Sequence, residues 1–269
     1  YSKFPSLVAG TLSQVDHFAV QGNLDRKHLQ LLGVPDLKIT ETGSIKFDVN
    51  VPPSLKESAE VLRRQLGQDR LIWIAGSTRE GEEGRILSVY KHLKTEFPSL
   101  LLVLVPRHPE RFDVIARKVQ RRELVCIRRS ENTADLDANV DVYLGDTMGE
   151  LSLMYASSDL AFVGGSLEPL GGQNILEPSA LGVPVVFGPH MFNFPDISRW
   201  AVKEGAGKMV QDSEELESVV RELLANPNLR DDMGSRGLHL IKAHRGALHK
   251  NFQMLEGFKK SKQLAADKS

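Results

Sequence analysis

The sequence of 269 residues contains a single cysteine, no apolar run of membrane-spanning length and almost no net charge. One cysteine, Cys126, excludes an internal disulfide framework and fits a reducing compartment such as the cytoplasm. A membrane helix needs roughly 18–20 consecutive apolar residues, and no segment approaches that length. The formal net charge of −1 argues against a general nucleic-acid binder, which would be basic overall. What remains is an ordinary globular composition, with 41% hydrophobic and 26% charged residues.

Motifs that mark several enzyme classes are missing as well. The histidines are scattered and show no metal-ligand spacing, so we expect neither a metal ion nor another cofactor. Neither the Walker lysine motif nor Gly-x-Ser-x-Gly occurs. Lysine and arginine are absent from residues 130–198, whereas basic residues are dense across residues 107–129. A phosphate bound in the first of these stretches must rely on backbone amides or on a cation from elsewhere in the fold, and we expect that cation to be Arg107.

Short apolar runs alternate with amphipathic helical stretches along most of the chain. The runs that look like strands cover residues 71–75, 100–105, 124–127, 140–144, 160–163 and 183–187. Apolar strands separated by helices are typical of a parallel sheet that is covered on both faces. The pattern therefore predicts an α/β fold, a Rossmann-like doubly wound parallel sheet.

Polar or glycine-rich turns follow these predicted strands. Ligands of doubly wound sheets bind beyond the carboxyl ends of the strands, which lie along one edge. The sequence therefore predicts one crevice built from five separate turns: Gly76-Ser77-Thr78, Arg107-His108, Asp146-Thr147, Gly164-Gly165-Ser166 and Gly188-Pro189-His190.

The strongest single signal is the Gly-Gly-Gln-Asn sequence at residues 171–174, which leads into a predicted helix opening at Asn174, with Glu177 one turn later. Glycine permits positive φ and a close approach of backbone to ligand, and amides at a helix start attract phosphate. A carboxylate can accept hydrogen bonds from ribose hydroxyls. An asparagine N-cap and a first-turn glutamate would explain Asn174 and Glu177 without any ligand. They do not explain a second glycine pair at residues 164–165, so we favour a nucleotide site.

Three other turns allow both a structural and a functional interpretation. Ser77 and Thr78 either begin a capped helix or donate to a substrate carboxylate or phosphate. The Pro-Arg-His-Pro sequence at residues 106–109 is either a surface turn or a rigid mount for Arg107 and His108, and its two prolines favour ligand binding. Residues 146–151 are either a helix start capped by Thr147 or a segment whose backbone flanks a base and whose Glu150 reaches the crevice.

The first 48 residues do not look like a complete domain, because one helix between two short strands cannot close a core. We expect residues 1–48 to be the end of a preceding domain with its linker, and residues 49–269 to form a second, complete domain. Since no initiator methionine precedes Tyr1, we expect the chain to be part of a longer protein.

Together these motifs resemble the C-terminal half of the 3-deoxy-D-manno-octulosonic acid (Kdo) transferases, which build the inner core of lipopolysaccharide. The resemblance covers nearly the whole chain, at residues 42–48, 73–78, 105–111, 146–151, 162–167, 174–178 and 188–190. The family is similar in fold to the two-domain GT-B glycosyltransferases, whose C-terminal domain binds the sugar nucleotide. The resemblance therefore implies a C-terminal GT-B domain that binds CMP-Kdo, within an enzyme whose acceptor is a lipid A precursor.

The resemblance also implies which residues contact the donor. Arg107 and the backbone around it would meet the cytidine side, while Met148, Gly149 and Glu150 would flank the nucleotide. His108 is also assigned to the donor site. The phosphate would be received by Gly171, Gly172 and Asn174, and the ribose by Glu177. Looser assignments for the Kdo or phosphate groups are Ser77, Thr78 and Ser166. Two positions depart from the family pattern: Gln173 stands where histidine is common, and Glu168 where an apolar residue is expected.

The catalytic base of the resembling family is a glutamate of the N-terminal domain, which no residue of this chain matches. We therefore expect a donor-binding portion of an inverting transferase that is inactive alone, with its parent enzyme at the cytoplasmic face of the bacterial inner membrane. Two alternatives remain open. One is another GT-B enzyme that uses a UDP-sugar, either a transferase or an epimerase. The other is a non-enzymatic nucleotide-binding domain.

Overall fold

The computed structural model describes residues 5–131 and 134–266. The chain forms two compact units, each considered by itself. Unit 1 combines Tyr1–Val49 with Ile241–Ser269, and unit 2 is Asn50–Leu240. The predicted second domain ran to residue 269, whereas the structure groups the last 29 residues of that range (241–269) with the start of the chain.

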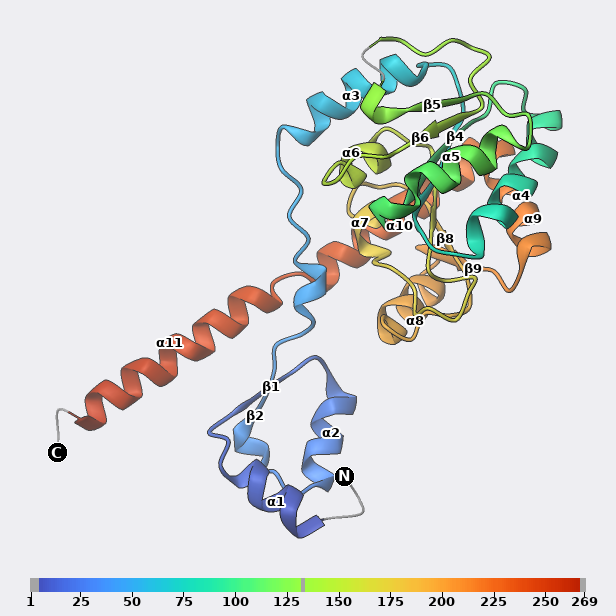
Figure 1. The fold of residues 1–269 in the computed structure, drawn as a ribbon. Helices are drawn as coiled ribbons and strands as arrows, with labels where there is room; N and C mark the ends of the chain where they lie inside the picture. The colour runs from blue at the N-terminus through green and yellow to red at the C-terminus, as the bar shows by residue number, and fades with distance from the viewer. Residues whose placement is uncertain (1–4, 132–133, 267–269) are drawn as a thin grey trace. The chain divides into compact units, whose positions relative to one another are not determined.

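Unit 2 is built on a seven-stranded parallel sheet of order β5-β6-β4-β3-β7-β8-β9 (Figure 1). Its strands are β3 (Ile72–Thr78), β4 (Leu101–Pro106), β5 (Cys126–Arg128), β6 (Val142–Leu144), β7 (Leu160–Val163), β8 (Val185–Phe187) and β9 (Gly207–Met209). Every neighbouring pair is parallel, which confirms the predicted sheet. All strand carboxyl ends therefore lie along one edge, as predicted for the five turns.

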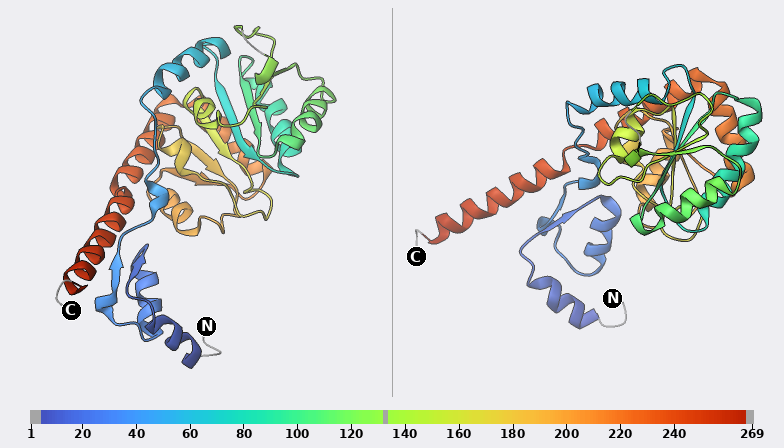
Figure 2. Two further views of the ribbon diagram at one scale, coloured as in Figure 1. Left: turned by 60° about the vertical axis from the view of Figure 1, so that its left-hand side comes forward. Right: turned by 45° about the horizontal axis from the view of Figure 1, so that its top comes forward.

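Both faces of this sheet are covered. All residues of β3 and β4 are buried, which explains why their sequences read as continuous apolar runs. Successive strand residues point to opposite faces. Trp73 and Ala75 enter one core with α4 (Glu82–Glu96) and α9 (Ser213–Ala225), whereas Ile72 and Ile74, which are just as buried, face the other side. The helices form two groups accordingly: α4 packs with α5 (Phe112–Gln120) and α9, and α3 (Leu55–Leu66) packs with α6 (Leu151–Ala156) (Figure 2).

Two helices of unit 2 begin with residues that are typical of helix N-termini. The helices of unit 2 are α3 (Leu55–Leu66), α4 (Glu82–Glu96), α5 (Phe112–Gln120), α6 (Leu151–Ala156), α7 (Leu176–Ser179), α8 (Pro195–Lys203), α9 (Ser213–Ala225) and most of α10 (Pro227–His244). Short 3₁₀ turns occur at Pro109–Arg111 and Arg129–Glu131. The Asp212 side chain accepts from the Glu214 and Glu215 amides and so caps α9. Pro195 at the first turn of α8 fits a position where no amide donor is needed.

Unit 1 contains a two-stranded parallel sheet of β1 (Phe18–Val20) and β2 (Ile39–Glu41). Its helices are α1 (Pro5–Ser13), α2 (Asn23–Leu31) and α11 (Ala247–Ala266), with 3₁₀ turns at Asp36–Lys38 and Ile45–Phe47. The Asp48 carboxylate accepts from the amides of Gly246 and Leu248, each at 2.6 Å, and thereby caps the start of α11. The Phe47 ring stacks on His244 with centroids 4.9 Å apart. These contacts join the end of α10 and the start of α11 to the first 48 residues.

None of the described helices combines the length and the apolar character that crossing a membrane requires.

Candidate functional site

The crevice of a doubly wound sheet lies where the strand order reverses. Here the chain enters the sheet at β3, continues to β4, β5 and β6 on one side, and then crosses to β7 on the other. The turns after β3 and β7 therefore flank the reversal point. The Gly164 amide donates to the Gly76 carbonyl at 2.9 Å, and a methyl group on Gly164 would lie 2.6 Å from the Thr78 Cα. The two turns are in direct backbone contact, which requires glycine at residue 164.

The turn at residues 164–167 is occupied by a carboxylate of the protein itself. Glu82, in the first turn of α4, is fully buried. Its Oε1 accepts from the amides of Ser166 and Leu167 at 2.9 and 3.0 Å. Its Oε2 accepts from the amides of Gly165 and Arg79 at 2.7 and 2.8 Å. Converging backbone amides form an anion site, and here Glu82 provides the anion.

The three serine and threonine residues predicted to meet the Kdo or phosphate groups lie at this reversal point and are buried. The Ser166 hydroxyl donates to the Val163 carbonyl at 2.5 Å and accepts from the Gly188 amide at 2.8 Å. Ser77 has a left-handed backbone with φ 54°. The Thr78 hydroxyl is fully buried without a hydrogen-bond partner. The structure thus places all three beside the crevice and uses the Ser166 hydroxyl to join the ends of β7 and β8.

The glycine pair at residues 171–172 has a packing role. Both residues have positive φ, 94° and 74°, and methyl groups there would lie 2.2 Å from the Asn193 side chain and 2.3 Å from the Met191 sulfur. The Gly172 amide donates to the Gly165 carbonyl at 2.7 Å, and the Gln173 amide donates to the Gly164 carbonyl at 3.1 Å. Two amides that the sequence assigned to a phosphate-receiving loop therefore dock this loop on the 164–167 turn.

Asn174 and Glu177 form a polar pair beyond these glycines. Asn174 donates through Nδ2 to Glu177 Oε1 at 3.2 Å and accepts at Oδ1 from the Leu176 amide at 3.2 Å. The helix begins at Leu176 rather than at Asn174, and the Asn174 side chain forms a local turn before it by accepting from the Leu176 amide. Both side chains are half-buried.

The charge that Glu177 experiences comes from a distant part of the sequence. Burial raises the pKa of Glu177, while the hydrogen bond from Asn174 and the charge of Arg107 lower it. Arg107 is exposed, and its amide donates to the Thr78 carbonyl at 3.0 Å. Tyr155 of α6 is buried, and burial and then the Glu177 charge raise the pKa of Tyr155. The charge of Arg107 thus acts on Glu177 at the edge beside β3 and β4, where Asn174 binds Glu177.

The segment at residues 148–150 lies after β6. Met148 is 66% exposed, and Gly149 has φ 83° with open space around it. Arg129 donates to both Glu150 carboxylate oxygens, at 2.8 and 3.1 Å, and the Thr147 hydroxyl also donates to Glu150. The Arg129 hydrogen bond holds the pKa of Glu150 below its usual range. A cavity of about 720 Å³ adjoins this segment and is lined by Arg129, Thr147 and Glu150 together with side chains of α3.

The His108 side chain lies near one carboxylate. Its Nδ1 lies 3.7 Å from a carboxylate oxygen of Glu110, and its side chain is 41% exposed. Of the two departures, Glu168 is paired with Arg85 at 2.9 Å, which explains a charged residue there. Within residues 5–131 and 134–266, no group of His, Cys, Asp or Glu has the arrangement of a metal site.

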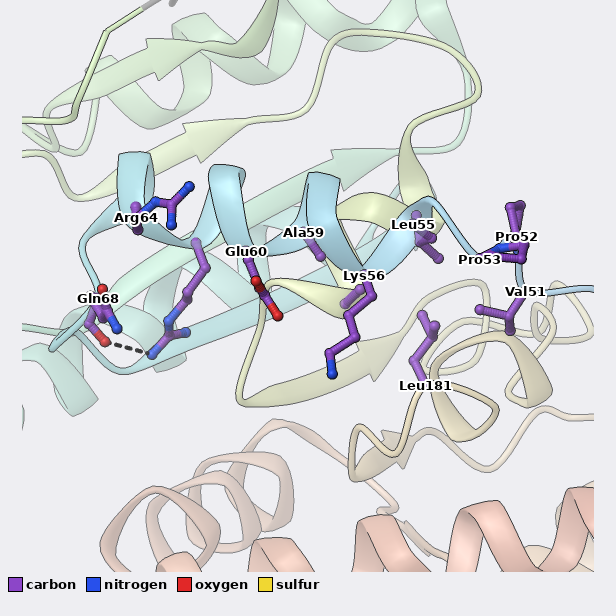
Figure 3. A pocket seen from close by; sticks show the side chains of 12 residues that line it. Val51, Pro52, Pro53, Leu55, Lys56, Ala59, Glu60, Arg64, Gln68 and Leu181 are labelled. Carbon is purple, nitrogen blue, oxygen red and sulfur yellow. Dashed lines mark hydrogen bonds between the residues drawn. The ribbon is translucent and has the colours of Figure 1, made fainter.

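A cavity of about 770 Å³ lies on another side of unit 2, along α3 (Figure 3). It is lined by the apolar residues Val51, Pro52, Leu55 and Leu181 and by charged side chains such as Lys56 and Arg64. Arg63, also in its wall, donates to the Gln68 carbonyl and to Asp159, near the amino ends of β3 and β7. No predicted site residue lines this cavity, so it is separate from the crevice.

Sequence reasoning missed three residues of this edge. They are Glu82, Tyr155 and Arg129, none of which the sequence pattern marks as a site residue. The glycine at residue 76 is the one trace of Tyr155 in the turn sequences, because a methyl group at Gly76 would lie 2.2 Å from the Tyr155 hydroxyl. Three of the four amides that Glu82 accepts lie more than 80 residues away along the chain, so no local pattern marks them.

The profile of the family "Glycosyl transferases group 1" matches residues 52–239, most of unit 2. The chain belongs to the glycosyl transferases group 1. Its relatives include a 3-deoxy-D-manno-octulosonic acid transferase of Haemophilus influenzae, 42% identical over 96% of this chain, and one of Bordetella pertussis, 38% identical over 81%. The chain spans 60% of the first relative and 51% of the second. The resemblance to Kdo transferases found in the motifs is therefore confirmed.

Solved structures with a similar fold agree with the predicted architecture. The crystal structure of the C-terminal CMP-Kdo binding domain of WaaA from Acinetobacter baumannii is 37% identical, with a TM-score of 0.66. That match covers 70% of this chain and 97% of the other. UDP-GlcNAc 2-epimerase from Neisseria meningitidis, 17% identical with a TM-score of 0.56, shares the fold over 89% of this chain and 62% of its own. The predicted GT-B-like α/β fold is thus confirmed.

Proposed function

We propose that this chain is the donor-binding portion of a Kdo transferase and that its ligand is CMP-Kdo. The observation that carries the proposal is the similarity to a domain described as CMP-Kdo binding, which this chain matches at 37% identity over 97% of that domain. The relatives named Kdo transferases support it. The polar edge of unit 2 provides the chemistry that a nucleoside monophosphate requires.

In this proposal each group at the edge has a distinct role. Arg107 and its backbone meet the cytidine side and supply the positive charge that residues 130–198 lack. The Glu177 carboxylate accepts hydrogen bonds from ribose hydroxyls, and Asn174 donates toward the phosphate. Because the Gly172 amide already donates to Gly165, Gly171 and Gly172 act by bringing the backbone near Asn174 close to the phosphate. Met148, Gly149 and Glu150 flank the nucleotide.

The reaction belongs to the longer parent protein. We propose transfer of Kdo from CMP-Kdo to a lipid A precursor with inversion at the anomeric carbon and without a metal ion. The catalytic base and the acceptor site lie outside this chain, and the parent acts at the cytoplasmic face of the bacterial inner membrane. A transfer assay with this chain alone is expected to give no product, and product formation would overturn this part of the proposal.

Calorimetric titration with CMP and with UDP tests the donor. Binding of CMP with no comparable binding of UDP is expected. Asn174→Ala and Glu177→Ala are each expected to weaken CMP binding roughly tenfold or more, because each removes a side chain that is proposed to form a hydrogen bond with the ligand. Glu222→Ala, an exposed carboxylate of α9, is the matched control and should bind as the unchanged chain does. A clear preference for UDP would instead favour an enzyme that uses a UDP-sugar.

A further inference from the structure

Glu82 is the most completely hydrogen-bonded carboxylate at the crevice edge, yet it does not face the proposed ligand. Its side chain is fully buried. Each of its two oxygens accepts two backbone amides, those of Arg79 and Gly165 on one side and of Ser166 and Leu167 on the other. Burying a carboxylate is costly unless it is fully hydrogen-bonded. This arrangement meets that condition and fixes the shape of the 164–167 turn.

A continuous chain of hydrogen bonds leads from this turn to the donor site. The Gly165 and Gly164 carbonyls accept from the Gly172 and Gln173 amides at 2.7 and 3.1 Å. Asn174 is the next residue, and its side chain binds Glu177. The orientation of the pair assigned to phosphate and ribose therefore depends on a turn that Glu82 holds.

We propose that Glu82 is a positioning residue for the nucleotide, acting through the 164–167 turn on Asn174 and Glu177. The inference rests on the proposed function of the site. Converging amides in other proteins receive a ligand's phosphate. Here the protein's own carboxylate fills them, so the turn keeps its shape before the ligand arrives and the Asn174–Glu177 pair is preorganised.

The geometry predicts an unusual order among substitutions. In Glu82→Gln, the amide nitrogen must replace one of the two oxygens, and in either orientation it meets two N–H groups that need an acceptor. Glu82→Asp keeps both acceptor oxygens and loses one methylene. CMP affinity should therefore fall in the order Glu, Asp, Gln. A side chain that acted only by filling space would give the reverse order for Asp and Gln.

The first measurement is CMP affinity by calorimetry with the full 269-residue chain. Glu82→Gln is expected to weaken binding roughly tenfold or more, and Glu82→Asp by less. The control is Glu83→Gln. Glu83 is equally buried but binds Arg111 at 3.0 and 3.1 Å instead of the turn. This control should keep CMP affinity within about twofold, whatever it costs in melting temperature.

The second measurement needs no ligand and therefore separates this inference from the donor assignment. In a ¹⁵N amide spectrum of the unliganded chain, Glu82→Gln should shift the resonances of Gly172, Gln173 and the Asn174 side chain, and Glu83→Gln should leave them in place. If the unchanged chain fails to bind CMP while these shifts occur, the proposed donor is wrong and the positioning role stands.

If Glu82→Gln does not fold, amide hydrogen exchange in the unchanged chain tests the positioning role of Glu82. CMP should slow exchange of the Gly165, Ser166 and Leu167 amides together with that of the Gly172 amide, because one unit carries both. The inference is overturned by a Glu82→Gln chain that binds CMP normally, by an Asp variant weaker than the Gln variant, or by CMP protecting Gly172 without the turn.

Discussion

Two carboxylates of this domain lie near glycine-rich turns, and their surroundings differ sharply. Glu82 is fully buried and accepts four backbone amides of the protein. Glu177 is half-buried, binds one side-chain amide and lies within the field of Arg107. The hydrogen bonds of Glu82 are complete without a ligand. Glu177, in contrast, has a raised pKa and can accept further hydrogen bonds.

The difference between these two carboxylates shows that a glycine-rich turn after a strand does not by itself indicate a ligand site. The turn at residues 164–167 has the sequence expected of a phosphate site, but its amides are already satisfied within the protein. A glycine-rich turn therefore indicates close backbone approach, and only the destination of each amide shows whether a ligand or the protein makes that approach. The Asn174–Glu177 pair is the better candidate for a ligand-binding site because both side chains are only half-buried.

The largest expected effect comes from placing a methyl group at the closed turn. Gly164→Ala brings its Cβ to 2.6 Å from the Thr78 Cα and 2.7 Å from the Ser77 carbonyl oxygen, both backbone atoms. We expect a loss of about 3 kcal/mol or more in unfolding free energy, which lowers the melting temperature by roughly 6–12 °C. Calorimetric melting measures it.

The control for this substitution is Gly149→Ala at the open segment. Gly149 has φ 83° but no atom within 4 Å of the added methyl group. Only backbone strain remains there, so a loss of about 1 kcal/mol is expected. Equal melting of the two variants would mean that the closed turn is not closely packed.

A smaller effect is expected from removing the cation at the open site. Arg107→Gln should weaken CMP binding about tenfold at low salt, and the difference from the unchanged chain should shrink as ionic strength rises toward about 1 M. Titrations at several salt concentrations measure this. Arg121→Gln, which changes an exposed arginine at the end of α5, should have no effect. A deficit that does not depend on salt would show that Arg107 acts through packing rather than charge.

The smallest effect concerns stability at the open carboxylate. Burial raises the pKa of Glu177, so the unfolded chain ionises first as pH rises, and the charged form costs folding stability above the raised pKa. Glu177→Gln should therefore raise the melting temperature by about 2 °C at neutral pH. The gain should vanish at a pH below the ordinary pKa of glutamate, where Glu177 is neutral in both states. A gain that persists in acid would contradict this explanation.

The parallel sheet was predictable because its central strands are buried on both faces and therefore apolar throughout. β7 agrees with the predicted strand at both ends. Strand β9 was not predicted, because Gly-Lys-Met contains no apolar run, and α8 was not predicted either. Pairing with β8 decides that Gly207–Met209 is a strand. Such tertiary context overrides local preference at a sheet edge.

Less of the site could be predicted. The sequence suggested that Arg107 compensates for the missing cations, and the pKa effect on Glu177 is consistent with that suggestion. The destinations of individual amides could not be predicted, since the Gly172 amide could equally have faced a phosphate. The donor contacts assigned to these residues remain predictions.

The Asp48 cap of α11 has a consequence for how unit 1 acquires its structure. The carboxylate and its two amide partners are separated by 198 and 200 residues along the chain. During synthesis Asp48 emerges long before Gly246 and Leu248, and contacts of such long sequence separation form late. Unit 2, which lies between them in the sequence, can fold before Asp48 binds these amides. Unit 1 can therefore complete its fold only after the residues that follow unit 2 have been synthesised.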